Sequence, residues 1–396
     1  WTKIVTGLPD DPINAVREDT KKKGLLFASS ETATYVSFDD GDHWQSLRLN
    51  MPATSVRDLM IKDNDLVVAT HGRGFWILDD ISRLRQINNN VAKNSILFKP
   101  GNAIRVRWNV NTDTPIPPDE PAGQNPPDGA SIDYYLKDNV PGEVMLDILD
   151  ANGKIVRHYS SNDTLYKIPP VDIPLYWIRP QQILSNQQGA HRFIWDLHYE
   201  PLNLPASFPM TAIYKNTAPS PTSPWVMPGQ YTIKLSVAGQ TFVQSINVTM
   251  DPRVKTSKAD LKKQFDLSMV SYEGRKTTAN ISNETESMHQ QIKELLAKDA
   301  GKLADILTRL DKKLIDLEGA KTKSKSLNDL SGSFTSSFNE LQESDMPPTI
   351  KMINEVNEVG TNMKTLIQSW EKIKAVDIPE INKQLKNEGL NELNIK

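Results

Sequence analysis

The sequence predicts a multidomain protein in which β structure comes first and α structure last. Three observations predict this order. A β-type repeat offset by 43 residues, from Trp1 to Trp44, runs through residues 1–90, proline-rich short strands fill residues 93–252, and a helical period covers residues 256–396. We interpret these parts as the terminal blades of a β-propeller, an immunoglobulin-like β-sandwich and an antiparallel helical bundle.

The first part is predicted from the repeat. Leu25–Ser29 aligns with Leu66–Thr70, in the same order as Trp1 and Trp44. A spacing of roughly 40–45 residues made of short strands is typical of propeller blades. Two copies cannot close a ring of about four to eight blades. We therefore expect further blades upstream and interpret the chain as the C-terminal part of a larger protein.

A tight turn is predicted between the two copies, at Ser37, Asp39, Gly41 and Trp44. The glycine permits a positive φ, the aspartate can accept hydrogen bonds from turn N–H groups, and the tryptophan ring can pack between sheets. The alternative is a calcium loop, which requires a glutamate at its twelfth position. Asn50 occupies that position, so we predict a structural turn.

The segment Thr70–Trp76 contains the candidate binding residues His71 and Arg73. Gly72 and Gly74 flank the arginine, which indicates a sharp turn that presents its side chain. An exposed guanidinium could hold a carboxylate or a sulfate. Alternatively, Arg73 ties the last blade to the first blade or to the following domain.

The other two parts are predicted from turns and apolar spacing. Gly153 and Gly239 lie between strand-like segments and indicate two hairpins of a sandwich. Ser257 followed by Asp260 indicates the start of a helix. An apolar stripe of helical period follows, made of Leu303, Ile306, Leu307, Leu310, Leu314 and Leu317.

Composition excludes several classes of site. The chain has no cysteine, which excludes zinc–cysteine sites, thiol nucleophiles and disulfides. Its net charge of −3, with both signs mixed, does not suggest nucleic acid binding. The sequence contains no stretch of about 18 apolar residues, which is the length that would predict a membrane span. The six histidines are scattered, so we expect no metal site and no cofactor.

Several motifs together resemble those of one family. They are Ser37–Trp44, Ala69–Asp80, Asn125–Ala130, Phe193–Leu197 and Pro228–Thr232. In these motifs the chain resembles the bacterial sortilin-like proteins with BNR (Asp-box) repeats, often labelled glycosyl hydrolases. The resemblance implies an exported protein, in the periplasm, at the outer membrane or outside the cell. It also implies a non-catalytic binding or scaffold module for protein or glycan.

The alternative is an accessory part of an Asp-box glycoside hydrolase. Such an enzyme needs two carboxylates facing each other across a cleft. That constellation cannot be assembled from residues 1–90. We therefore assign no catalytic residue to this chain and place those of a hydrolase in the upstream blades.

A partner is expected for the first part. A blade buries apolar faces against both neighbours, and the preceding neighbour is not in the chain. We expect the face carrying Leu26, Ala28 and Tyr35 to lie open, with Trp1 filling the space between blades. Its partner would be the missing propeller half or another chain.

Overall fold

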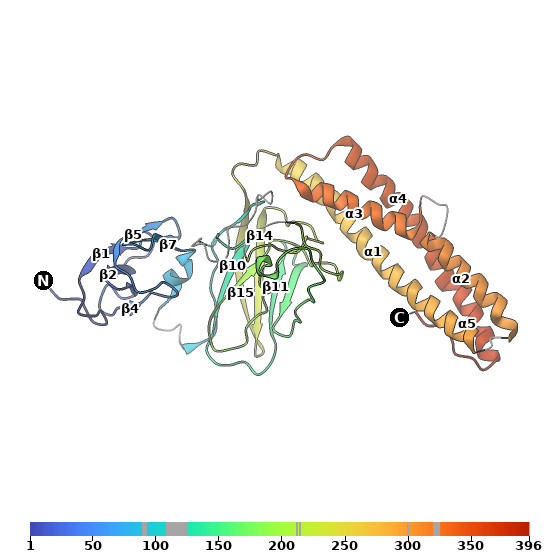
Figure 1. The fold of residues 1–396 in the computed structure, drawn as a ribbon, viewed down its shortest axis with the longest axis horizontal. Helices are drawn as coiled ribbons and strands as arrows, with labels where there is room; N and C mark the ends of the chain where they lie inside the picture. Colours follow the sequence, from blue (N-terminus) through green and yellow to red (C-terminus); the bar gives the residue numbers. More distant parts are fainter. Residues whose placement is uncertain are drawn as a thin grey trace. The chain divides into compact units, whose positions relative to one another are not determined.

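The computed structural model describes residues 1–88, 93–107, 123, 125–210, 213, 215–298, 301–319 and 325–395. It confirms that the protein combines several β-sheets with a C-terminal helical region (Figure 1). The last strand ends at Met250 and the first long helix begins at Lys258. Residues 89–92, at the predicted boundary between the first two parts, lie outside the described residues.

The first sheet is antiparallel and follows sequence order. Its strands are β1 (Ile13–Glu18), β2 (Leu26–Ser30), β3 (Thr34–Ser37) and β4 (Gln45–Ser46). Every residue of β2 and β3 is buried, so this sheet has apolar contacts on both of its faces. Such burial is typical of a sheet between two layers.

The second sheet is also antiparallel and packs on the first. It consists of β5 (Val56–Lys62), β6 (Asp65–Thr70) and β7 (Phe75–Leu78), and the 3-10 helix η1 (Ile81–Gln86) follows. β5 lies beside β1 and β2 (Figure 1). The two sheets and η1 share one core, made of Leu25, Phe27, Val36, Met51, Val56, Leu59, Leu66, Val68, Ile81 and Leu84.

The middle of the chain forms two further sheets, ordered β13-β10-β8 and β12-β11-β14-β15-β9. Their strands are β8 (Ile96–Leu97), β9 (Ala103–Arg105), β10 (Ala130–Leu136), β11 (Val144–Leu149), β12 (Ile155–Ser160), β13 (Gly189–Trp195), β14 (Gly229–Val237) and β15 (Gln240–Met250). The rings of Trp195 and Tyr231 lie 5.4 Å apart and join the two sheets. The predicted hairpins at Gly153 and Gly239 are confirmed, and both glycines have a positive φ.

The C-terminal region is helical. Its elements are α1 (Lys258–Ala297), η4 (Gly301–Leu303), α2 (Ala304–Glu318), α3 (Leu327–Glu343), α4 (Ile350–Lys372), the π turn η5 (Ile373–Asp377) and α5 (Ile378–Asn387). The Ser257 hydroxyl accepts a hydrogen bond from the N–H of Asp260, so the predicted helix start is confirmed. α1 packs against α2, α3 and α4.

The chain forms two compact units, and the helical unit also includes two short segments from earlier in the sequence. Residues His198–Leu204 and Pro221–Met227 belong to the helical unit. The Tyr272 hydroxyl donates to the carbonyl of Glu200 over 2.8 Å, and the Trp225 N–H donates to the Gln342 side chain over 3.1 Å. Among the described residues, no helix is both long and apolar enough to cross a membrane.

Candidate functional site

The turn between β3 and β4 is held by its own side chains. The Ser37 hydroxyl donates to Asp39 over 2.9 Å and accepts from the N–H of Gly41 over 2.9 Å. Asp39 also accepts from the N–H of His43 and contacts its imidazole, which together hold the pKa of that carboxyl below its usual range. Gly41 has a φ of 95°, a conformation that favours glycine. The structure therefore brings these side chains together to close a hairpin.

Trp44 packs behind this turn against the start of the chain. Its side chain is buried, and its indole N–H donates to the carbonyl of Ile4 over 3.0 Å. Its backbone N–H donates to the carbonyl of Thr6 over 2.8 Å. The indole therefore holds the first residues of the chain against the first sheet.

The prediction of an open face on the first sheet is wrong. Leu26, Ala28 and Tyr35 are buried, and together with Trp44 they form a cluster on which Leu8 packs. Trp1 fills no space between sheets, because its side chain is fully exposed. The physical reason is that the segment before β1 lies over this face and buries apolar surface that we expected a neighbouring blade to cover.

The candidate residues His71 and Arg73 lie in the turn between β6 and β7. The Thr70 hydroxyl donates to the carbonyl of Gly74 over 2.7 Å and accepts from the N–H of Arg73 over 3.1 Å, which closes the turn. Gly72 and Gly74 both have a positive φ. Both candidate side chains are exposed, and within the described part of the chain neither makes a hydrogen bond or an ion pair. The turn therefore presents one imidazole and one guanidinium to an external group.

An exposed apolar surface continues from this turn along the second sheet. Ile77 lies opposite Val67, which in turn lies opposite Met60, and Phe75 lies opposite Ala69. Residues directly opposite each other in a sheet share a face. Exposed fractions are 55% for Met60, 79% for Phe75 and 59% for Ile77. We call this surface, with Val67 and Ala69, the β5–β7 face.

Sequence reasoning did not find the β5–β7 face. Its signal was present in Phe75–Leu78, where all four residues are apolar, although a strand with one solvated face normally alternates. Trp76 and Leu78 pack against the core shared by the two sheets. Phe75 and Ile77 therefore point outward.

A buried charge network joins η1 to the strands of the middle region. Asp133 on β10 accepts two hydrogen bonds from Arg192 over 2.9 Å each and one from Arg83 over 3.1 Å. Arg192 also donates to the carbonyls of Asp79 and Asp80 over 3.1 Å. Burial alone would lower the pKa of Arg192, but its bonds to Asp133 outweigh burial and raise it. These groups are engaged with one another, which indicates a structural role.

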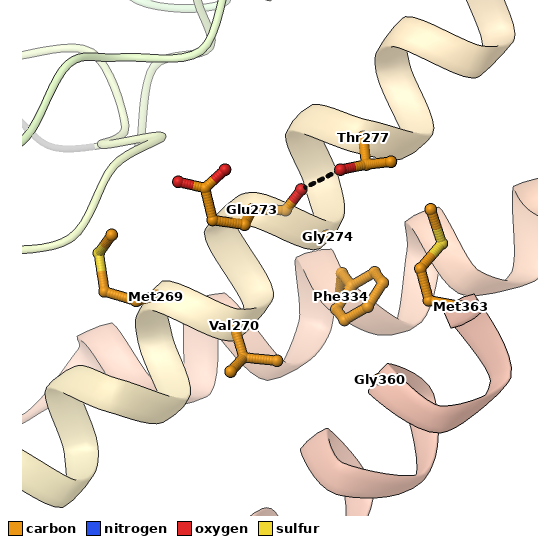
Figure 2. A pocket seen from close by; sticks show the side chains of 8 residues that line it. All are labelled: Met269, Val270, Glu273, Gly274, Thr277, Phe334, Gly360 and Met363. Carbon is orange, nitrogen blue, oxygen red and sulfur yellow. Dashed lines mark hydrogen bonds between the residues drawn. The ribbon is translucent and has the colours of Figure 1, made fainter. Parts of the chain in front are cut away.

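The helical unit carries an open groove of about 380 Å³ (Figure 2). Its lining residues come from α1, α3 and α4 and are Met269, Val270, Glu273, Gly274, Thr277, Phe334, Gly360 and Met363. The Thr277 hydroxyl donates to the backbone carbonyl of Glu273 over 2.8 Å, and the Glu273 carboxylate points away from Phe334. The groove therefore offers apolar contact without a set of converging polar groups.

No protein-family model and no curated protein matches the chain. A similarity is found to the crystal structure of the extracellular domain of a hybrid two-component system from B. thetaiotaomicron, with 9% identity and a TM-score of 0.15. It covers 62% of this chain and 26% of that one. The chain thus spans about a quarter of the length of that structure.

Proposed function

We propose that this chain is the C-terminal part of an exported, sortilin-like β-propeller protein and acts as a non-catalytic module that binds another polypeptide. The β5–β7 face carries this proposal. Contiguous apolar surface beside exposed polar groups is typical of a protein interaction site. The exposed Met60, Phe75 and Ile77 provide that surface, with Arg73 at the adjoining turn.

The geometry of the two N-terminal sheets supports the blade interpretation. Both sheets are antiparallel meanders, and they share one apolar core. Neighbouring propeller blades have this relationship, and each blade presents its other face to the next blade. On this interpretation, the β5–β7 face would meet a further blade, supplied by the missing propeller half or by another chain.

The chemistry of the face favours a polypeptide with an apolar sheet surface and a carboxylate at its rim. Burial of apolar area is favourable by about 25 cal/mol per Å². The Arg73 guanidinium has no ion pair within the described residues and can donate two parallel hydrogen bonds to a carboxylate. In this proposal the middle sheets form the immunoglobulin-like sandwich that follows the blades in the chain. Export is proposed on a separate ground, the family resemblance.

Site-specific photo-crosslinking in the full-length protein tests this proposal. A photoreactive amino acid at position 77 is expected to crosslink to a β-sheet segment, either upstream in the protein or in a second chain, as identified by mass spectrometry. Val243 is the matched control, because it is also on a strand and 57% exposed, against 59% for Ile77. Equal crosslinking at both positions, or none at position 77, would contradict the proposal.

A further inference from the structure

The segment that follows α5 is held on the helical unit in the way that a groove holds a peptide. α5 ends at Asn387, and Gly389 follows with a φ of 70°. The N–H of Leu390 donates to the carbonyl of Leu385 over 2.9 Å, which closes the helix end. Residues 391–395 then continue outside any helix or strand, and we call them the 391–395 segment.

Two side-chain amides clamp the backbone of this segment. Asn382 on α5 donates to the carbonyl of Leu393 over 2.8 Å and accepts from its N–H over 2.7 Å. Gln291 on α1 makes the same pair of bonds with Asn394, over 2.7 and 2.8 Å. A carboxamide is both donor and acceptor, so each one satisfies both backbone groups of a residue. Such contacts hold an extended peptide of any sequence.

One side chain anchors the segment. Leu393 is 2% exposed and belongs to the same core cluster as Leu295 of α1 and Leu385 of α5. Its neighbours Glu392 and Asn394 are both exposed. A single buried anchor carries most of the affinity in many protein interfaces, while the residues around it contribute little. The groove therefore selects for leucine at one position.

The segment leaves space beside α1 unfilled. An open pocket of about 310 Å³ lies between them. Its lining residues are Gln291, Glu294, Leu295 and Lys298 of α1 and Asn391, Glu392 and Asn394 of the segment. A peptide with larger side chains next to its leucine would gain contacts in this pocket, which includes one anionic and one cationic side chain of α1.

We propose that α1 and α5 form a binding groove for an extended peptide of another protein, anchored by a leucine. The 391–395 segment occupies this groove until such a peptide displaces it. A tethered segment competes at an effective concentration on the order of millimolar. Only a peptide with additional contacts therefore displaces it, and the open pocket provides them. The groove belongs to the helical unit and the β5–β7 face to the other unit, so the two proposals can fail independently.

Fluorescence anisotropy with the full chain and a labelled peptide of the sequence Gly389–Ile395 tests the groove. Leu393→Asp should bind this peptide at least about tenfold more tightly than wild type, because a charged side chain leaves the core and removes the competing segment. The same peptide with aspartate in place of leucine should not bind. Equal binding to both chains, or no binding to folded Leu393→Asp, would overturn the proposal.

A second substitution tests the amide clamp. In the Leu393→Asp chain, Asn382→Ala should weaken peptide binding by at least about tenfold, because two backbone hydrogen bonds are lost. Asn387→Ala is the matched control, because it changes an exposed asparagine of the same helix. The clamp is refuted if the two variants bind the peptide equally well.

Hydrogen exchange of the wild-type chain decides the matter even if Leu393→Asp fails to fold. The amides of Leu393 and Asn394 should exchange at least about a hundredfold faster than that of Ile292 inside α1, because the segment opens without unfolding of the helices. Equal protection would show that the segment leaves only when the unit unfolds, which contradicts displacement. Sedimentation covers the remaining occupant: a wild-type dimer that Leu393→Asp dissociates would make it a second copy of the chain and overturn the proposal.

Discussion

Asp19 and Arg85 form a two-pronged ion pair that joins the first sheet to η1. Arg85 Nε and a terminal nitrogen donate to the carboxylate over 3.0 and 2.9 Å. The Asp19 side chain is completely buried, and it also accepts from the N–H groups of Lys21 and Lys22. Arg85 further donates to the side chain of Asn64, in the turn between β5 and β6, over 2.6 Å. One arginine therefore connects the turns of both N-terminal sheets.

Removal of this arginine should destabilise the N-terminal sheets. Arg85→Ala leaves a buried carboxylate without its cation, which is expected to lower the free energy of unfolding by about 3–5 kcal/mol. Hydrogen exchange of the β2 amides measures this local stability. Arg57→Ala, which breaks an exposed pair with Glu31, is the control and should have a much smaller effect. Equal effects of the two substitutions would contradict the structural role of Arg85.

The same pair predicts sensitivity to acid. Burial alone would raise the pKa of Asp19, but the bonds from Arg85, Lys21 and Lys22 outweigh it and lower the pKa below the usual value of 3.8. Its stabilising contribution is therefore complete above the unfolded-state pKa of about 3.9 and is lost as the pH falls through the folded-state pKa. Thermal unfolding from about pH 5 to about pH 2 covers the pH range around that value. The melting temperature should fall more steeply with decreasing pH for the wild-type chain than for Asp19→Asn. Parallel curves would refute this assignment.

His289 predicts the opposite pH dependence in the helical unit. Its ring nitrogens on α1 contact Asp311 over 2.6 Å and Glu318 over 3.2 Å, both on α2. Burial alone would lower the pKa of His289, but the two carboxylates outweigh it and raise the pKa above 6.5. The contribution of charged His289 to the stability of the helices is therefore complete below about pH 6.5. It is lost as the pH rises through the folded-state pKa.

Helix unfolding followed by circular dichroism on both sides of this range checks the prediction. His289→Gln should flatten the dependence, whereas His71→Gln, which changes an exposed histidine, should leave it unchanged. An unaltered pH profile for His289→Gln would show that the pair does not stabilise the helices.

Two glycines in the helices should respond to alanine in opposite directions. A Cβ at Gly274 would lie 2.5 Å from ring atoms of Phe334, whereas a Cβ at Gly332 would have no neighbour within 4 Å. Gly274→Ala should therefore lower the free energy of unfolding by about 1–3 kcal/mol through overpacking. Gly332→Ala should raise it by up to about 1 kcal/mol, because alanine is the better helix former. Urea unfolding measures both, and stabilisation by Gly274→Ala would contradict the packing at Phe334.

Local features were predictable because residues close in sequence create them. The cap at Ser257 needs only the N–H of Asp260, and the hairpin at Gly153 needs only the few residues around its turn. The apolar stripe of α2 follows the helical period, and its Leu307, Leu310 and Leu314 are buried. The coarse order of parts, several β-sheets followed by a C-terminal helical region, was predictable on these grounds.

The candidate site was predictable only in part. The two glycines around Arg73 indicated a turn that exposes this side chain, as it does. The open face was predicted on the wrong sheet, because the sequence does not show that the first residues of the chain cover Leu26 and Tyr35. Exposure of an apolar strand depends on what packs against it.

The sequence by itself determined the helix start at Ser257, the hairpins at Gly153 and Gly239 and the change from strands to helices, since these depend on contacts within a few residues. Only the tertiary structure decided which charges pair and which apolar face stays open. Asp19 and Arg85 lie 66 positions apart, and Arg192 lies 59 from Asp133. No local periodicity in the sequence indicates such partners, because only folding of the chain brings them together. Once they are buried, each charge is stabilised only if its partner is present.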